Sequence, residues 1–156
     1  GNKVFKTSFP AYDNQSSGPV KEYLSGAISP DPNEISARAA SLFYAVDRYI
    51  SYKERIEKFY KDDETIILFD RYVSSNLLHQ GGKLLSKTGN YEELDSFIDW
   101  IEEREFGDLE LPKPTCVFFL YIPVDFSLMQ KRKKEGFALF FFAQISFIIV
   151  NVIVGT

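Results

Sequence analysis

The stretch "IILFDRYVSSNLLHQ", Ile66 to Gln80, decides the fold class and also raises the question of function. Its apolar start, "TIILF" when Thr65 is included, is typical of a short strand that is covered on both faces of a parallel sheet. The run ends abruptly at Asp70 and Arg71, and a polar, hydroxyl-rich segment follows. In open α/β sheets, ligands bind beyond the carboxyl ends of the strands, so these two charges lie where a ligand would be met.

Strand and helix patterns alternate on both sides of this stretch. Apolar runs predict further strands at Val4–Phe9 and Cys116–Ile122, and periodic segments predict helices over Ile35–Tyr60 and Tyr91–Glu105. The order β, α, β, α, β predicts an α/β fold with a parallel sheet flanked by helices. We expect the first helix to pack through an apolar stripe, which consists of Ile35, Ala39, Leu42, Phe43, Val46, Ile50 and Phe59.

Composition limits the class of protein. The chain of 156 residues with 45% hydrophobic content is long enough for one domain with a core. A formal charge of −4 gives no reason to expect nucleic acid as a partner, while anionic small molecules remain in view. The single Cys116 excludes an internal disulfide, and one cysteine with one histidine gives no zinc spacing. A reducing, cytoplasmic compartment fits best.

Two different roles suit the charged pair that ends the central strand. An aspartate after an apolar strand is used by phosphoryl-transfer enzymes to hold magnesium, directly or through water. Aspartates in this position also serve as helix caps or turn formers, which is the structural alternative for Asp70. The planar guanidinium of Arg71 favours the functional interpretation, because it can clamp a phosphate through two hydrogen bonds.

Four ordered blocks of the sequence resemble those of the thymidylate kinases, which phosphorylate dTMP to dTDP with ATP. The resemblance runs from about Lys3 to Lys134. It implies a P-loop NTPase-like fold, a transferase of nucleotide biosynthesis in the cytoplasm, dTMP and ATP as substrates, Mg²⁺ as a cofactor, and a homodimer formed by helix packing. The blocks are "SFPAYD" (8–13), "SLFYAVDRY" (41–49), "DRYVSSN" (70–76) and "LPKPTCVFFLYIP" (111–123).

The resemblance implies roles for both charges of the central block and for the long helix. Arg71 is expected to grip the 5′-phosphate of dTMP, and Asp70 to organise Mg²⁺ through water, which makes them the catalytic pair. Tyr44 and Arg48 lie four residues apart and share one helix face, where Tyr44 is expected to stack on thymine and Arg48 to donate to its carbonyl oxygen. The alternatives are an exposed Tyr and Arg on a solvated face, or a register that puts Asp47 at the arginine position.

Loop positions carry the remaining expected contacts. The resemblance places Tyr12 near the substrate phosphate, Asn76 near the base or sugar, and His79 where some members have a tyrosine close to the sugar. Ordinary turn chemistry is the alternative for the first two, and a structural role is the alternative for the histidine. Ala11 departs from the family, because an arginine that touches phosphate often stands there; phosphate binding would then depend more on Arg71.

The pattern GxxxxGK[ST], which holds ATP phosphates in this family, does not occur in the sequence. The family places that loop after its first strand, and this chain begins about where the unit ends. We therefore expect a sheet that lacks its first central strand, between "TIILF" and "CVFFLYI", and no cofactor-binding residues for ATP. The chain would then be a catalytically incompetent fragment of a dTMP kinase; the alternative is a non-catalytic nucleoside monophosphate-binding module.

The composition changes abruptly after Gly136, which suggests a boundary between a partial thymidylate kinase domain (1–135) and an apolar tail (136–156). Residues Phe137–Thr156 carry no formal side-chain charge and follow the basic cluster 131–134. Length and flanking charge permit a transmembrane anchor, the third hypothesis for the function. The abrupt shift favours an aberrant tail from a frameshift or wrong gene boundary. A strand that fills the gap in the sheet is the last alternative, because "SFIIVNVIV" is β-branched.

Overall fold

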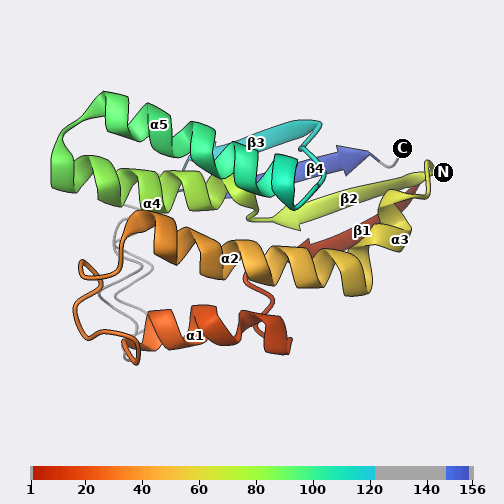
Figure 1. The fold of residues 1–156 in the computed structure, drawn as a ribbon. Helices are drawn as coiled ribbons and strands as arrows, with labels where there is room; N and C mark the ends of the chain where they lie inside the picture. Colours follow the sequence, from red (N-terminus) through yellow and green to blue (C-terminus); the bar gives the residue numbers. More distant parts are fainter. Residues whose placement is uncertain (1, 122–146, 155–156) are drawn as a thin grey trace.

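The computed structural model describes residues 2–121 and 147–154, and Figure 1 shows their arrangement. The predicted strands and helices are present, with boundaries that differ by a few residues. The strands are β1 (Lys3–Ser8), β2 (Thr65–Asp70), β3 (Cys116–Tyr121) and β4 (Phe147–Val154). The α-helices are α1 (Gly18–Ser25), α2 (Ala37–Ser51), α3 (Glu57–Tyr60), α4 (Val73–Thr88) and α5 (Tyr91–Glu102). A 3₁₀ turn, η1 (Gln15–Ser17), and two π-helical turns, η2 (Tyr52–Ile56) and η3 (Glu103–Asp108), complete the described elements.

The four strands form one mixed sheet in the order β1-β2-β4-β3. Strands β1 and β2 are parallel, with Ser8 opposite Asp70, so their carboxyl ends meet at one edge. Strand β4 runs antiparallel to both of its neighbours. The prediction of a purely parallel sheet is therefore wrong, because a strand from the end of the chain enters it in the opposite direction.

Strand β4 occupies the position where we expected a gap. Asn151 pairs with Phe69 of β2 on one side and with Val117 of β3 on the other. The strand interpretation of the tail is thus confirmed for Phe147–Val154, whose β-branched residues suit a central strand. Within the described residues, no helix is long and apolar enough to cross a membrane. The basic cluster 131–134 and the tail before Phe147 lie outside the described residues.

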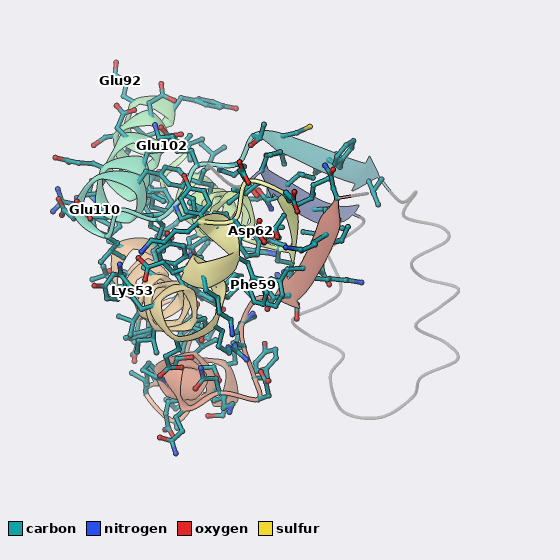
Figure 2. The ribbon with its side chains drawn as sticks, turned by 90° about the vertical axis from the view of Figure 1, so that its right-hand side faces the viewer. Lys53, Phe59, Asp62, Glu92, Glu102 and Glu110 are labelled. Atoms are coloured by element: carbon teal, nitrogen blue, oxygen red, sulfur yellow. The ribbon has the colours of Figure 1, made fainter. Side chains whose placement is uncertain are left out.

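The described helices α2, α4 and α5 lie on one face of the sheet, as the view in Figure 2 shows from the side. Side chains alternate along β2, where Thr65, Ile67 and Phe69 are buried and the residues between them are half-buried. The core joins the strands to the helical layer and contains Phe9, Ile67, Phe69, Tyr72, Val73, Phe97, Ile101 and Ile153.

Helix α2 buries a different face from the one that its apolar spacing predicts. Leu42 and Val46 are 46% and 44% exposed, so the middle of the predicted stripe is not buried, whereas Phe59 packs against the core and Phe43 against Tyr23 of α1. The buried face combines small and polar side chains, namely Ala37, Ala40, Ser41, Ala45, Asp47 and Arg48. Small side chains allow α2 to pack closely against α4. The buried charges of Asp47 and Arg48 have partners in other segments, Ala11 and Ser16 for Asp47 and Glu105 for Arg48.

Candidate functional site

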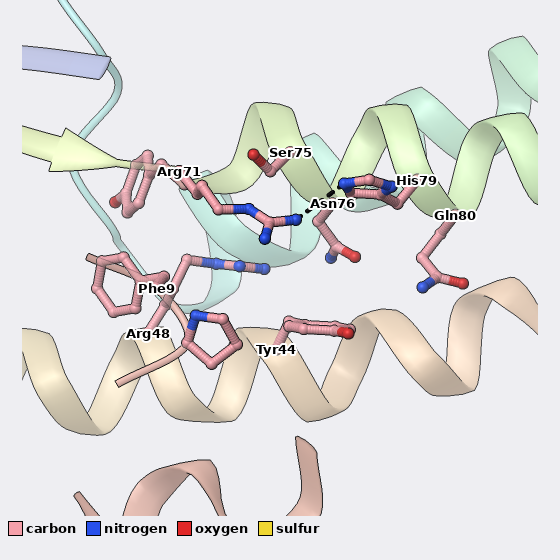
Figure 3. A pocket seen from close by; sticks show the side chains of 10 residues that line it. Phe9, Tyr44, Arg48, Arg71, Ser75, Asn76, His79 and Gln80 are labelled. Carbon is pink, nitrogen blue, oxygen red and sulfur yellow. Dashed lines mark hydrogen bonds between the residues drawn. The ribbon is translucent and has the colours of Figure 1, made fainter. Parts of the chain in front are cut away.

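A pocket lies at the edge where the carboxyl ends of β1 and β2 meet (Figure 3). Its floor and walls come from three segments: the end of β1, the inner face of α2, and the connection from β2 into α4. Residues on α4 recur every three or four positions, which places them on one helix face. The lining residues are Phe9, Pro10, Tyr44, Arg48, Arg71, Tyr72, Ser75, Asn76, His79 and Gln80.

The pocket is open to solvent on one side. The space that no atom fills there is about 330 Å³, a volume that includes open solvent at the mouth. The enclosed part is only about large enough for a water molecule, well below the roughly 300–1,000 Å³ typical of small-molecule sites. A ligand of nucleotide size would therefore lie largely in the open side of the pocket.

Arg71 is held at the centre of this site by both its backbone and its side chain. Its φ angle is 66°, which is the left-handed region that non-glycine residues seldom adopt. Its backbone N–H donates to the carbonyl of Ile149 on β4 at 2.9 Å, and such strained backbone is often found at functional sites. The tail strand thus contributes directly to the position of the predicted phosphate-binding residue.

The side chain of Arg71 contacts His79, one of the predicted substrate contacts. Arg71 Nη2 lies 2.8 Å from His79 Nε2, the interaction drawn in Figure 3. A guanidinium only donates hydrogen bonds, so Nε2 is the acceptor and the proton of the neutral ring sits on Nδ1. Burial, and then the charge of Arg71, lower the pKa of His79 to about 4.

Arg48 is buried and ion-paired. Its Nε donates to Glu105 Oε2 at 2.6 Å, and its Nη2 donates to Glu105 Oε1, which makes a bidentate pair with both side chains 2% exposed. The alternative of a solvated helix face is therefore wrong for Arg48. Nη1 is not used by Glu105, and the side chain still lines the pocket.

Tyr44 lies one helical turn before Arg48 and presents its ring to the pocket (Figure 3). The ring is half-buried, and this burial raises the pKa of the Tyr44 hydroxyl well above its usual range. The phenol is neutral at physiological pH, so the residue offers an aromatic face and a polar tip.

Asp47, which the alternative register would place at the arginine position, anchors a loop instead of lining the pocket. Its carboxylate accepts hydrogen bonds from the backbone N–H of Ala11 at 2.9 Å and from Ser16 Oγ at 2.5 Å. These bonds fasten the loop after β1 to α2, and Asp47 is not among the pocket residues. The sequence gives no indication of this role of Asp47, because its hydrogen-bond partners are 36 and 31 residues away.

Two predicted residues lie outside the pocket lining. Tyr12 is 51% exposed; burial raises the pKa of its hydroxyl and the nearby charge of Arg71 lowers it, so the two side chains interact electrostatically. Asp70 is the half-buried last residue of β2.

The described residues contain no group of three or more His, Cys, Asp or Glu side chains arranged to hold a metal. One carboxylate fits Mg²⁺ that is otherwise bound by water and substrate phosphates.

Two buried amides complete the site. Asn76 and Gln80 are 5% and 4% exposed, and Asn76 Nδ2 donates weakly to the Ser41 carbonyl at 3.4 Å. Within the described part of the chain, Asn76 Oδ1 and Gln80 Oε1 have no hydrogen-bond partner. Buried acceptors normally have one, so these atoms mark a place for a donor from a ligand or water.

The structure brings Tyr44, Arg48, Arg71, Asn76 and His79 into the lining of one pocket, together with residues that the prediction did not name. Phe9 and Pro10 belong to the quoted block "SFPAYD", and Tyr72 and Ser75 belong to "DRYVSSN". Gln80 lies four residues after Asn76, a spacing that gives the same helix face. Comparison of the sequence with models of known protein families and with curated proteins finds no match to either.

Proposed function

We propose that this pocket binds a pyrimidine nucleoside 5′-monophosphate, with dTMP as the preferred ligand. The observation that carries the proposal is the position of Arg71, a cation at the carboxyl end of β2 inside a pocket that also contains buried amide acceptors and an aromatic ring. Among the described residues, the salt bridges do not include Arg71, so its charge is available to a phosphate.

Phosphate recognition is assigned to Arg71. A guanidinium can donate two parallel hydrogen bonds to a phosphate group, and such charge-assisted bonds are about twice as strong as neutral ones. The strained backbone and the contact with His79 hold the side chain before the ligand arrives. The charge of Arg71 acts on Tyr12, on the exposed loop after β1, and the Tyr12 hydroxyl is proposed as a second contact to the phosphate.

Base recognition is assigned to the other end of the pocket. The Tyr44 ring offers a stacking surface, and the Nη1 group of Arg48, which Glu105 does not use, can donate to a base carbonyl oxygen. Asn76 Oδ1 can accept a hydrogen bond from the ring N–H of thymine or uracil. A pyrimidine with alternating carbonyl and N–H groups complements this set of donors and acceptors.

We propose further that the chain belongs to the lineage of the thymidylate kinases, with a P-loop NTPase-like sheet. In that reaction Arg71 would neutralise the acceptor phosphate, and Asp70 would hold the water shell of Mg²⁺, which supplies charge neutralisation when bound. The sequence contains no GxxxxGK[ST] pattern, so the residues present here account for the dTMP side and not for ATP. We propose phosphoryl transfer and a homodimer only for a form of the protein that also holds ATP.

Calorimetric titration with dTMP, dUMP and thymidine tests the proposal. We expect saturable binding of dTMP with one site per chain, slightly weaker binding of dUMP, and binding of thymidine that is at least about tenfold weaker because the charge-assisted bonds to Arg71 are lost. A folded protein that binds none of the three would refute the proposal. Equal affinity for thymidine and dTMP would refute the role of Arg71.

A further inference from the structure

The charges around the pocket do not balance a bound phosphate monoester. Such a group carries about −1.5 to −2 at pH 7. Arg48 is already neutralised by the bidentate contact with Glu105. Among the described residues that line the pocket, Arg71 therefore supplies the one cation without a carboxylate partner, and roughly one negative charge of the ligand is left over.

His79 is the titratable side chain in contact with that cation. Its Nε2 lone pair faces Arg71 Nη2 at 2.8 Å. A phosphate that binds Arg71 from the pocket has its oxygens near the same lone pair. Two lone pairs facing each other repel, whereas a protonated Nε2 would donate to the phosphate and supply the missing positive charge.

We propose that Arg71 and His79 form one proton-linked anion site. The phosphate of the ligand displaces the contact between the two side chains, His79 takes one proton from solvent at Nε2, and both residues then donate to the phosphate. No covalent bond changes, and the proton comes from the buffer. The inference rests on the proposed function and adds to it, because it makes the pocket selective for a doubly charged ligand group.

The ligand-free state is ready for such uptake. Burial and the charge of Arg71 keep the pKa of His79 at about 4, so the ring is neutral near pH 7. A bound dianion reverses the sign of the local charge and favours the imidazolium. Among the described residues, the other titratable groups around this part of the pocket are Tyr44, Asp47 and Arg48 of α2, Glu105 of η3, Asp70 of β2, Tyr72 before α4, Tyr12 of the loop after β1, Tyr23 of α1, and Lys83 one turn along α4.

The chain has one histidine, so the ring nitrogen signals of the intact protein report on His79 alone. We would record them by ¹⁵N NMR at pH 7.5 without ligand, with saturating thymidine and with saturating dTMP. The expected result is a neutral Nδ1–H ring in the first two samples and a doubly protonated ring with dTMP. A ring that stays neutral while backbone signals show saturation by dTMP would overturn the inference and leave the proposed function intact. Absence of any spectral change with dTMP would overturn both.

A variant gives a second readout. His79→Gln keeps an acceptor for Arg71 and removes the titration. We lower the pH from 7.5 to 6.5 and compare the gain in dTMP affinity of the two proteins. The gain should be about tenfold larger for the wild-type protein than for His79→Gln, because binding to the wild type takes up one proton. The phosphate of dTMP titrates identically with both proteins, so it cancels in the comparison. Parallel pH profiles would contradict proton uptake by His79.

Discussion

Arg48 of α2 and Glu105 of η3 form a bidentate ion pair in which both side chains are 2% exposed, although 57 residues separate them in the sequence. The pair ties the helix that carries Tyr44 to the turn that follows α5. It also fixes the guanidinium of Arg48 beside the pocket. Because both charges are buried, neither partner can be removed without leaving the other uncompensated.

Removal of Glu105 is therefore predicted to be strongly destabilising. We expect Glu105→Ala to lower the free energy of unfolding by about 3 to 5 kcal/mol, since it leaves the Arg48 charge buried and unpaired. The double variant Arg48→Met with Glu105→Leu replaces the pair by apolar side chains and is expected to recover most of that loss. Urea unfolding at pH 7 measures both. If the double variant is as unstable as the single one, the cost does not come from an unpaired charge.

The low pKa of His79 predicts a pH dependence of stability. The folded-state pKa of about 4 lies below the ordinary value of 6.5, so between these values the unfolded chain binds a proton that the folded chain does not. Stability is therefore full above pH 6.5 and falls as pH is lowered through 4. The ring is partly exposed, so we expect a loss of about 1 to 2 kcal/mol.

Thermal or urea unfolding of wild type and His79→Gln from pH 7.5 to 4 isolates this contribution. Asp62 and Glu57 also have lowered pKa values through their lysine partners, but both proteins share them. The His79→Gln variant should lose less stability over the range. Identical curves would show that the ring is as easily protonated in the folded chain as in the unfolded one.

Adjacent glycines on α4 provide a matched test of the helical layer. A Cβ at Gly81 would lie 3.0 Å from Leu94 Cδ1 of α5, whereas a Cβ at Gly82 would meet nothing within 4 Å. Gly82→Ala is expected to stabilise the protein by about 0.8 to 1 kcal/mol through helix propensity. Gly81→Ala should gain less or become destabilising, because the contact with α5 is crowded. Chemical denaturation compares the two, and an equal gain would contradict the close packing of α4 on α5.

Neighbouring residues of β4 test its place in the sheet. Ile153 is 1% exposed and faces the helices, while Val154 is 43% exposed. Ile153→Ala is expected to cost about 2 to 4 kcal/mol of stability, and Val154→Ala less than about 1 kcal/mol. Unfolding in guanidinium chloride gives both values. A small effect at both positions would mean that β4 does not contribute to the core.

The part of the fold that could be predicted consists of segments whose local pattern is typical of only one kind of secondary structure. The runs at Val4, Thr65 and Cys116 are short, apolar and bounded by turn residues, and each is a strand close to the expected limits. The end of the chain was ambiguous, because an apolar β-branched run suits a membrane anchor and a central strand equally well. Its pairing with β2 and β3 depends on residues at least 26 positions away, which local sequence does not encode.

The same distinction applies to the site. Arg71 directly follows β2, and Asn76 and His79 lie in the first two turns of α4, so the one stretch 66–80 predicted that they lie together. The buried face of α2 was mispredicted, because Leu42 and Val46 have the stronger periodicity while small residues such as Ala40 make the contact. The pairing of Arg48 with Glu105 is a tertiary contact, and an arginine alone gives no indication of which carboxylate it will meet.

The affinity of dTMP for the wild-type chain, Arg71→Gln and Arg38→Gln, measured by calorimetry at pH 7, shows whether Arg71 binds the phosphate. Arg38 begins the same helix that carries Tyr44, but its side chain is exposed and contacts Trp100 and Ser96, so it controls for loss of a positive charge elsewhere. We predict saturable binding to the wild-type chain and to Arg38→Gln, and a loss of at least about tenfold for Arg71→Gln. Unchanged affinity of a folded Arg71→Gln protein would contradict the proposal that Arg71 binds the phosphate of dTMP.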